Sequence, residues 1–491
     1  MDTLELLNFY NKWWQTNKVP EELYQEFKKD ICNYLVSELP FGLYPRIISL
    51  VGLRRTGKTT LLYQLINHLL DNEVPAKRIL FINISDPLIA NNLTFLEKLL
   101  EDYQQNVIKE NFDRLSEPVY LFFDEVQYLP QWELFLKRLY EQKFKIKYII
   151  TGSGSLKIVK KTRESLVGRI AEYKVFPFTF NEFIKFKESK NRSLQIISLL
   201  DNVRIGRLRK SDFFSIYFLL QKYHSFPLLG KKLMERKLEF INLHKQLVIL
   251  LNEHMEKGGF PEIIATSGQE IGYRYLIQDI LDRTLTQDIP QFAQVRDPSL
   301  LQTLLIMAAQ HSGSTFSYDS ISKDTGARIE TIRNYFQYLS SSFLISVITK
   351  FRKSEIAKFK SKKKFYIADL GIRNAIMKLS KQSINSLQNK GINAETVTVN
   401  FLLNHVLSNS GMKISFWHDG KYEVDIIIKF LEQIIPIEVK YRNIIEDSQI
   451  KGLKKFIDIY KTGGGIVITD SLINFRENIV YLPLWLFLLF F

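Results

Sequence analysis

The sequence predicts an α/β protein with a doubly wound parallel sheet in its N-terminal part, a mostly helical middle and a second, smaller α/β unit at the C-terminus. In the N-terminal part, short apolar runs are each followed by a stretch with helical periodicity, the pattern of parallel strands joined by helices. These runs lie at residues 47–51, 79–84, 119–123, 148–151 and 172–175. Residues 186–350 are mostly helical in pattern. The C-terminal strands are expected at residues 413–417, 424–429, 434–440 and 465–469, with helices around 393–408 and 447–460.

Composition sets limits on the class of protein. The chain has 491 residues, 46% of them apolar, so it is long enough for several folded domains. Lys and Arg number 67 against 52 Asp and Glu, a net charge of +15. This surplus is compatible with a polyanionic partner such as double-stranded DNA, or with an ordinary basic background. The single cysteine, Cys32, excludes an intramolecular disulfide and a cysteine-based zinc site.

Neither terminus has the pattern of a targeting or membrane segment. The N-terminus carries an acidic residue at position 2 and no basic region before an apolar core, so a signal peptide is not expected. Residues 479–491 are very apolar but fall short of the roughly 20 needed to cross a bilayer. We expect a buried strand and short helix there, and a cytoplasmic protein without a membrane partner.

Motifs and periodicity divide the chain into five regions. Residues 1–40 are expected to form amphipathic N-terminal helices leading into the core. The predicted regions that follow are the α/β core with the parallel sheet at 41–185, a helical insertion or lid at 186–270, a helical and winged-helix domain at 271–364, and the C-terminal α/β domain at 365–491.

Residues 52–59 match the phosphate-loop motif G-x-x-x-x-G-K-[ST], directly after an apolar run and before an apolar helical stretch. In such a loop the glycines let backbone N–H groups curl around phosphates, and the helix N-terminus adds positive potential. Lys58 is expected to reach the β- and γ-phosphates, and the Thr59 hydroxyl to ligate Mg²⁺. The sequence thus predicts a P-loop NTPase core that uses ATP and Mg²⁺. The expected nucleotide-binding residues are Gly52, Arg54, Arg55, Thr56, Gly57, Lys58, Thr59, Thr60 and Ser153.

Two adjacent acids end the run at 119–123. Asp124 is expected at the carboxyl tip of a strand beside the loop, where its carboxylate holds the Mg²⁺ shell. Glu125 is expected to polarise the attacking water, which favours hydrolysis over binding alone.

Three further polar positions are candidates for contacts with phosphate. Ser153 ends another predicted strand and is expected to sense the γ-phosphate. Arg169 follows a loop and is either an arginine finger, and so catalytic beside Lys58 and Glu125, or part of a structural salt bridge. Arg54 and Arg55 contact either phosphate or the fold beneath the loop, and the sequence does not decide between these.

Residues 316–349 have the pattern of a helix, a short turn at Gly326, a second helix and a strand. The second helix places Ile329, Ile332, Tyr335, Phe336 and Leu339 on one face. This spacing fits a helix-turn-helix of the winged type. The stretch 349–364, with eight basic residues and one acidic residue, follows where a wing belongs. It is either a phosphate-contacting surface or a solvated charged face.

Several motifs in this order resemble AAA-type ATPases of archaea and bacteria that carry a C-terminal domain of unknown function with a restriction-endonuclease-like fold. The motifs are GLRRTGKTTLL, LFFDEVQYLPQWE, IITGSGS, SLVGR, GGFPE, YLIQDILDRTLTQDIP and PIEVKY. The resemblance covers nearly the whole chain and implies an AAA-like module, a winged helix and a nuclease-like module. The chain departs from the family at Leu53, where proline is frequent, and in a long helical insertion near 186–250.

A second group of carboxylates lies on two C-terminal strands. Asp425 is followed, after 12 intervening residues, by Glu438 and then Lys440, the D…E-x-K arrangement of the restriction-endonuclease-like fold. Strand alternation puts Glu438 and Lys440 on one face, and Asp425 joins them if the strands pair as a hairpin. Glu395 matches the early acidic residue of this pattern, and Gln449 is a candidate accessory. These residues form a candidate nuclease site in which two carboxylates bind Mg²⁺.

Three functions compete at this point. The leading hypothesis is an ATP-driven switch or motor that works on nucleic acid. The second is an ATP-gated, Mg²⁺-dependent nuclease, and the third is an ATP-controlled signalling scaffold without nucleic acid. A homo-oligomer is compatible with all three, although no feature of the sequence specifies a ring interface.

Overall fold

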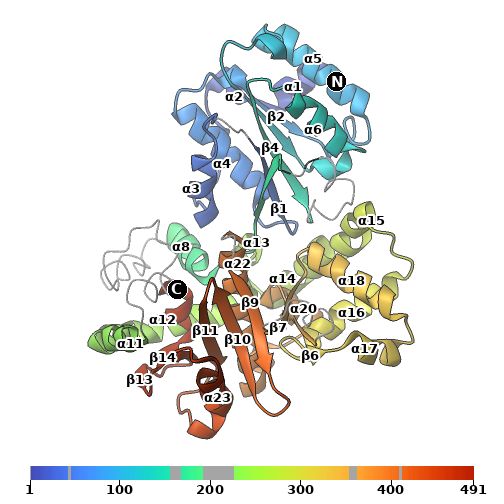
Figure 1. Ribbon diagram of the computed structural model, residues 1–491. Coiled ribbons are helices and arrows are strands. Elements are labelled where there is room, and N and C mark those ends of the chain that lie inside the picture. The colour runs from blue at the N-terminus through green and yellow to red at the C-terminus, as the bar shows by residue number, and fades with distance from the viewer. Residues whose placement is uncertain are drawn as a thin grey trace. The chain divides into compact units, whose positions relative to one another are not determined.

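The computed structural model describes residues 2–42, 46–154, 166, 168–191, 226–352, 362–408 and 412–490 (Figure 1). The chain forms two compact units. Unit 1 comprises Met1–Phe176, Arg283–Gln294 and Ser341–Phe343, and unit 2 comprises Pro177–Asp282, Val295–Ser340 and Leu344–Phe491. Ser165, most of the insertion near 186–250 and residues 353–361 of the basic stretch lie outside the described residues.

Unit 1 is built on a five-stranded sheet in the order β2-β3-β4-β1-β5. Its strands are β1 (Ile47–Gly52), β2 (Ile79–Asn83), β3 (Val119–Asp124), β4 (Ile146–Ser153) and β5 (Ile170–Lys174). Its helices, including short 3₁₀ and π segments (η), are α1 (Thr3–Tyr10), α2 (Trp13–Thr16), α3 (Asp30–Ser37), α4 (Lys58–Asp71), η1 (Ala76–Arg78), α5 (Leu93–Asp102), η2 (Tyr103–Ile108), η3 (Phe112–Arg114), η4 (Val126–Tyr128), α6 (Trp132–Glu141), η7 (Thr284–Asp288) and α15 (Ile289–Phe292).

All pairings in this sheet are parallel, which confirms the doubly wound α/β core and the five strands predicted for it. β4 lies between β1 and β3, so the carboxyl ends of these three strands meet at one edge of the sheet. In open α/β sheets, ligands bind outside the carboxyl ends of the strands. The loop after β1 and the acids ending β3 therefore share one edge.

The N-terminal helices belong to unit 1 and cover the edge of its sheet that β2 forms. The Asn11 side chain accepts the N–H of Phe81 at 2.7 Å and donates to its carbonyl at 3.0 Å, as a neighbouring strand would. The indole N–H groups of Trp13 and Trp14 both donate to the Ile79 carbonyl. Unpaired backbone groups on an edge strand can pair with another chain and promote aggregation. Here side chains of the N-terminal helices form hydrogen bonds with backbone groups of β2.

Unit 2 contains a nine-stranded mixed sheet in the order β13-β14-β12-β11-β10-β9-β7-β8-β6. Its strands are β6 (Thr315–Phe316), β7 (Ile345–Lys350), β8 (Lys363–Ile367), β9 (Lys413–His418), β10 (Glu423–Phe430), β11 (Gln433–Val439), β12 (Gly465–Thr469), β13 (Asn474–Arg476) and β14 (Ile479–Pro483). Its helices are α8 (Phe180–Lys190), α11 (Phe226–Glu235), α12 (Lys237–Lys257), α13 (Pro261–Ala265), α14 (Gln269–Tyr275), η6 (Leu276–Asp282), α16 (Pro298–Gln310), α17 (Tyr318–Thr325), α18 (Ile329–Ser341), α20 (Leu370–Ile376), α21 (Lys381–Ile384), α22 (Leu387–Ser408), η8 (Asp447–Ile450), α23 (Lys451–Tyr460) and α24 (Leu484–Phe490).

The sheet of unit 2 is continuous across the domain boundary expected between residues 364 and 365. That boundary falls inside β8, which pairs antiparallel with β7. β7 in turn pairs in parallel with β9, through Thr349 opposite Ser415 and Lys350 opposite Phe416. The middle region and the C-terminal strands therefore share one sheet, which no local sequence pattern reveals.

The helix, turn, helix and strand expected at 316–349 are present as α17, Gly326, α18 and β7. Gly326 ends α17 with φ +70°, a conformation that favours glycine. The apolar face of α18 is buried at Ile332, Tyr335, Phe336 and Leu339. Ile329, expected on the same face, is 38% exposed because it stands in the first turn of the helix.

The apolar C-terminus forms a buried strand and a short helix, as expected. β14 is fully buried, and α24 packs against helices α8, α12 and α22 of the same unit. The indole of Trp485 in α24 donates to His244 of α12 at 3.0 Å. No helix among the described residues is long and apolar enough to cross a membrane.

The motif GGFPE lies where three segments of unit 2 meet. A Cβ on Gly258 would approach the Asp369 carboxylate at 2.2 Å, and one on Gly259 would approach the Phe178 carbonyl at 2.4 Å. Gly259 donates its N–H to Asp369 at 2.8 Å and accepts the Phe178 N–H at 2.7 Å. Gly258 thus leaves room for the Asp369 side chain and Gly259 for close approach of the Phe178 backbone, so both glycines have a structural role.

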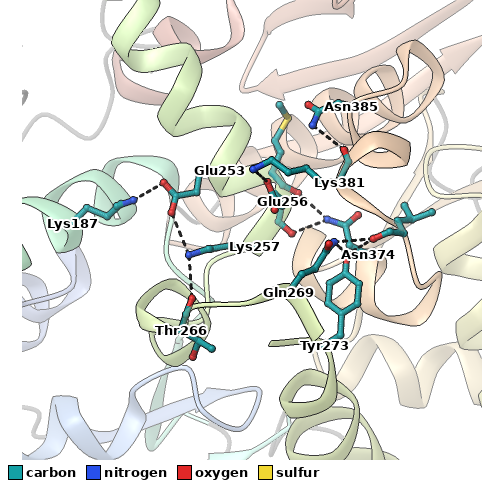
Figure 2. A network of polar contacts seen from close by, with 12 residues as sticks. Lys187, Glu253, Glu256, Lys257, Thr266, Gln269, Tyr273, Asn374, Lys381 and Asn385 are labelled. Atoms are coloured by element: carbon teal, nitrogen blue, oxygen red, sulfur yellow. Dashed lines mark hydrogen bonds and ion pairs between the residues drawn. The ribbon is translucent and has the colours of Figure 1, made fainter. Parts of the chain in front are cut away.

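A polar network fixes the end of α12 in front of this motif (Figure 2). Glu253 lies between Lys187 at 2.5 Å and Lys257 at 3.3 Å. The Asn374 amide donates to two carbonyls in the last turn of α12, those of Met255 and Glu256. These contacts join α8, α12 and α20 into one rigid part of unit 2.

Candidate functional site

The phosphate loop connects β1 to α4 in unit 1, and its two glycines have different roles. A Cβ on Gly52 would meet the Val175 carbonyl at 2.1 Å, so only glycine lets the chain pass there. Gly57 has φ +92° and caps α4, with open space where a side chain would stand. The first N–H groups of α4 have no partner within the helix, and Lys58, Thr59 and Thr60 form its first turn. The loop therefore has the backbone donors that a phosphate requires.

Lys58 is held inside this loop. Its ammonium group donates to the carbonyls of Leu53 at 2.9 Å and Gly52 at 3.1 Å, and the residue is 4% exposed. The Thr56 hydroxyl donates to the same Leu53 carbonyl at 2.9 Å. The positive charge of Lys58 is thus held against the backbone of the loop.

Thr59 and Asp124, the two predicted magnesium ligands, are in direct contact. The Thr59 hydroxyl donates to Asp124 Oδ2 at 2.8 Å, and the Thr151 hydroxyl from β4 donates to Asp124 Oδ1. Burial and the neighbouring Glu125 raise the pKa of Asp124 to about 6, while the two hydroxyl donors oppose the shift. Thr151 was not expected from the sequence, although its place at the end of β4 was the available signal.

These residues fit Mg²⁺. The ion prefers oxygen ligands and is usually held by one or two protein groups together with substrate phosphates and water. One hydroxyl and one carboxylate that already touch supply this donor set. Within the described residues, no group of three or more His, Cys, Asp or Glu side chains is arranged to hold a metal, so the protein alone offers no complete cage here.

Glu125 stands directly after β3 in a left-handed conformation, with φ +56°. Its N–H donates to the Thr151 hydroxyl at 2.9 Å, and its carboxylate accepts the Gln127 amide. The same amide donates to Ser153 at 2.9 Å. Gln127 therefore links the predicted base to the predicted phosphate sensor, a role that sequence reasoning missed.

Arg54 points to partners distant in sequence. Its guanidinium forms a bidentate pair with Asp288, Nε to Oδ2 at 2.8 Å and Nη2 to Oδ1 at 2.6 Å. Nη2 also donates to the Tyr128 hydroxyl at 2.9 Å. The neighbouring Arg55 is exposed and has φ +62°. Of the two alternatives for Arg54, the structure shows contact with the protein.

Arg169 lies at the opposite end of the sheet from the phosphate loop. It directly precedes β5, and its carbonyl accepts the N–H of Ile47 at the start of β1. Its guanidinium donates to Glu141 at 2.9 Å. The loop follows the other end of β1, about 20 Å away at the rise of a β-strand. The structure therefore does not bring Arg169 to the phosphate loop of its own chain.

In unit 2, β10 and β11 pair antiparallel and bring together Asp425, Glu438 and Lys440. The Lys440 ammonium lies 2.5 Å from Glu438 and 3.9 Å from Asp425. The Val439 N–H donates to Asp425 at 2.9 Å. Gln449 is not part of this group, because its side chain accepts the Glu446 N–H at 3.2 Å and caps η8.

Lys364 from β8 lies in the middle of these acids, a position that corrects our interpretation of the basic stretch. Its ammonium is 2.5 Å from Glu423, 3.0 Å from Glu395 and 3.7 Å from Asp425, and its side chain is 3% exposed. We expected it to face solvent or phosphate with its neighbours. Burial alone lowers the pKa of Lys364, but the surrounding carboxylates outweigh it and raise the value.

Burial raises the pKa of two acids in this group, Glu438 and Glu395. Burial and Asp425 raise the pKa of Glu438 to about 8, with Lys440 opposing the shift. Burial also raises the pKa of Glu395 to about 7, against the effect of Lys364, and the Tyr366 hydroxyl donates to this carboxylate at 2.8 Å. As arranged, the group does not fit a divalent cation. An ammonium group already contacts three of the acids, and the described residues contain no group of three or more His, Cys, Asp or Glu side chains that could hold a metal ion.

Comparisons with known proteins agree with the loop geometry. Residues 44–184 match an AAA domain. Residues 249–383 match a domain of unknown function (DUF8612), and residues 390–487 match another (DUF4143). The chain thus has an AAA-type, ATPase-like domain followed by two domains without an assigned function. The winged-helix and restriction-endonuclease-like assignments go beyond these matches.

Similar proteins cover most of the chain. An uncharacterized protein of Methanocaldococcus jannaschii, MJ1544, is 25% identical over 91% of this chain and 89% of its own length. An uncharacterized protein of Haemophilus influenzae is 22% identical over 92% of this chain and 97% of its own length.

Two solved structures are also similar to part of the chain. C. elegans PCH-2 has 16% identity and a TM-score of 0.24, with 42% of this chain and 54% of that chain covered. The S. cerevisiae Hsp104-ADP complex has 14% identity and a TM-score of 0.27, with 84% and 48% covered. The matches span about half of each solved chain, and both TM-scores are too low to establish a shared fold.

Proposed function

We propose that this chain binds ATP with Mg²⁺, hydrolyses it, and uses the cycle as a switch or motor associated with nucleic acid. The observation that carries the ATPase part is the contact between Thr59 and Asp124 beside the buried Lys58. A phosphate in the loop would meet the ammonium of Lys58 and the N–H groups of α4. The magnesium ion, held by Thr59 and Asp124, would supply charge neutralisation at the phosphates.

Glu125 is the proposed general base. Its carboxylate is oriented by Gln127, and a water that donates to this carboxylate loses its proton as it attacks the γ-phosphate. The Ser153 hydroxyl accepts a hydrogen bond from the same Gln127 amide, and we assign it the role of sensing the γ-phosphate.

The experiment is ATP turnover by the full chain and by Lys58→Ala and Glu125→Gln variants, with Thr94→Ala as a control because Thr94 is exposed on α5. Lys58→Ala is expected to lose nucleotide binding. Glu125→Gln is expected to retain binding but lose turnover by about 100-fold or more. Turnover retained in Glu125→Gln would show that another group is the base, and binding retained in Lys58→Ala would contradict the phosphate-loop assignment.

The nucleic-acid part rests on the net charge of +15 and on the helix-turn-helix formed by α17 and α18. Arg333 on α18 is exposed, whereas Lys364 is buried and is not available to DNA. Binding to a duplex is expected to weaken steeply between about 50 and 300 mM salt, because counterions are released from the phosphates. Absence of binding at the lower salt concentration would instead favour the ATP-controlled scaffold.

A homo-oligomer would give Arg169 a catalytic role, toward the nucleotide of a second copy rather than its own. Arg169 directly precedes β5 and lies away from the phosphate loop of its own chain, so its guanidinium would reach a phosphate only at the nucleotide of a second copy. Sedimentation of the chain with and without ATP tests this, and a chain that stays monomeric in both conditions would leave Arg169 in its contact with Glu141.

A further inference from the structure

The pair between Arg54 and Asp288 joins the phosphate loop to a distant part of the chain. The two residues are 234 positions apart, and Asp288 lies within the segment that matches a domain of unknown function rather than the AAA domain. That segment, Arg283–Gln294, is nevertheless part of unit 1, while the chain on both sides of it belongs to unit 2. We call it the strap.

The ion pair between Arg54 and Asp288 is buried and bidentate. Asp288 is 3% exposed and accepts hydrogen bonds from both Nε and Nη2 of Arg54. Nη2 also donates to the hydroxyl of Tyr128, the last residue of the 3₁₀ turn that begins after Glu125. Removing one partner from a buried ion pair leaves the other charge uncompensated, which is strongly destabilising. A nucleotide phosphate therefore does not displace Asp288 from the guanidinium at low cost.

One edge of the Arg54 guanidinium takes no part in these contacts. Nε and Nη2 make all the hydrogen bonds that Arg54 forms within the described residues, so the N–H groups of Nη1 have no protein partner there. Arg54 stands in the loop two residues after Gly52 and four before Lys58. An arginine fixed along one edge and open along the other is suited to bind an anion without first losing its partner.

We propose that Asp288 is a positioning residue, which holds Arg54 so that Nη1 contacts the terminal phosphate of a nucleoside triphosphate. The strap thereby completes the nucleotide site with a group from outside the AAA domain, and it favours triphosphate over diphosphate. This proposal rests on the proposed function, because it requires the loop to bind nucleotide.

The test is a double-mutant cycle on the full chain, with binding of ADP and of a non-hydrolysable ATP analogue measured by calorimetry. The variants are Asp288→Asn, Arg54→Ala and both together, and Asp113→Asn, exposed in unit 1, is the matched control. Asp288→Asn is expected to weaken the triphosphate analogue by about tenfold and ADP far less. In the Arg54→Ala background, Asp288→Asn is expected to change neither affinity, because it acts through Arg54.

Other outcomes separate the two proposals. Equal weakening of both nucleotides by Asp288→Asn, or the same effect with and without Arg54, would overturn the positioning role. If Asp288→Asn does not fold, Tyr128→Phe removes a different support of the same guanidinium, and unchanged selectivity in that variant would also overturn it. Wild-type protein that binds neither nucleotide would mean that the proposed function itself is wrong.

Discussion

Lys364 and Glu395 form a 3.0 Å ion pair in the interior of unit 2, between β8 and α22. Glu423 approaches the same ammonium at 2.5 Å. The last residue of the basic stretch is therefore a counter-ion for the carboxylates of the candidate nuclease site. The ion pair connects two features that we interpreted separately from the sequence: the basic stretch expected to contact DNA, and the group of carboxylates expected to cleave it.

The first prediction concerns the stability of this cluster. Lys364→Met keeps the length of the side chain but removes the charge, which leaves Glu395, Glu423 and Asp425 without their shared cation. Breaking a buried pair in this way costs about 3–5 kcal/mol of unfolding free energy. Denaturant unfolding followed by tryptophan fluorescence measures the change. Lys429→Met, exposed on β10 of the same sheet, is the control. Equal midpoints for Lys364→Met and wild type would show that the ion pairs contribute nothing to folding.

The second prediction is that unit 2 does not cleave DNA. The ammonium of Lys364 contacts three of the acids that would otherwise be available to a divalent cation, and it competes with such an ion for their oxygen atoms. Supercoiled plasmid incubated with the chain, ATP and Mg²⁺ or Mn²⁺ is expected to remain intact. Asp425→Ala should behave like wild type in this assay. Metal-dependent nicking by wild type that disappears in Asp425→Ala would contradict this prediction and restore the nuclease hypothesis.

What the sequence predicted well was local. The strands of unit 1 follow from apolar runs, and the position of Asp124 at the carboxyl end of β3 follows from the two acids that end one of these runs. Lys364 was misinterpreted because its partners are at least 31 residues away, and within a run of lysines nothing distinguishes the one that is buried. Arg54 was left undecided for the same reason, since its partner lies 234 residues away. The continuous sheet of unit 2 depends on the pairing of β7 with β9, which no periodicity encodes.

The third prediction is a pH dependence of stability due to His254. This residue is buried against Phe180 and Phe183, and burial lowers its pKa to about 4, with a carbonyl contact to Phe178 opposing the shift. The unfolded chain, with a histidine pKa near about 6.5, binds the proton first as the pH falls. The stability contribution is therefore complete above about pH 6.5 and is lost progressively down to about pH 4, by up to about 3 kcal/mol.

Urea unfolding between pH 7.5 and pH 4.5 measures this effect. His254→Gln is expected to flatten the loss of stability on acidification, whereas the same substitution at His311, which is exposed, should leave the slope as in wild type. If the stability of His254→Gln falls with pH as steeply as that of wild type, the pKa of His254 does not differ between the folded and unfolded states.

The fourth prediction follows from the reciprocity of binding equilibria. If Nη1 of Arg54 contacts the terminal phosphate while Asp288 holds the other edge, nucleotide and strap each stabilise the position of the other. Amide hydrogen exchange within η7 and α15 should then slow when a triphosphate analogue binds, and slow much less with ADP. The exchange of β13 in unit 2 provides the internal reference. In Asp288→Asn the added protection of the strap should disappear even at nucleotide concentrations that saturate the loop. Protection that persists in this variant, or that is equal for both nucleotides, would mean that the strap is held by packing alone and does not report the γ-phosphate.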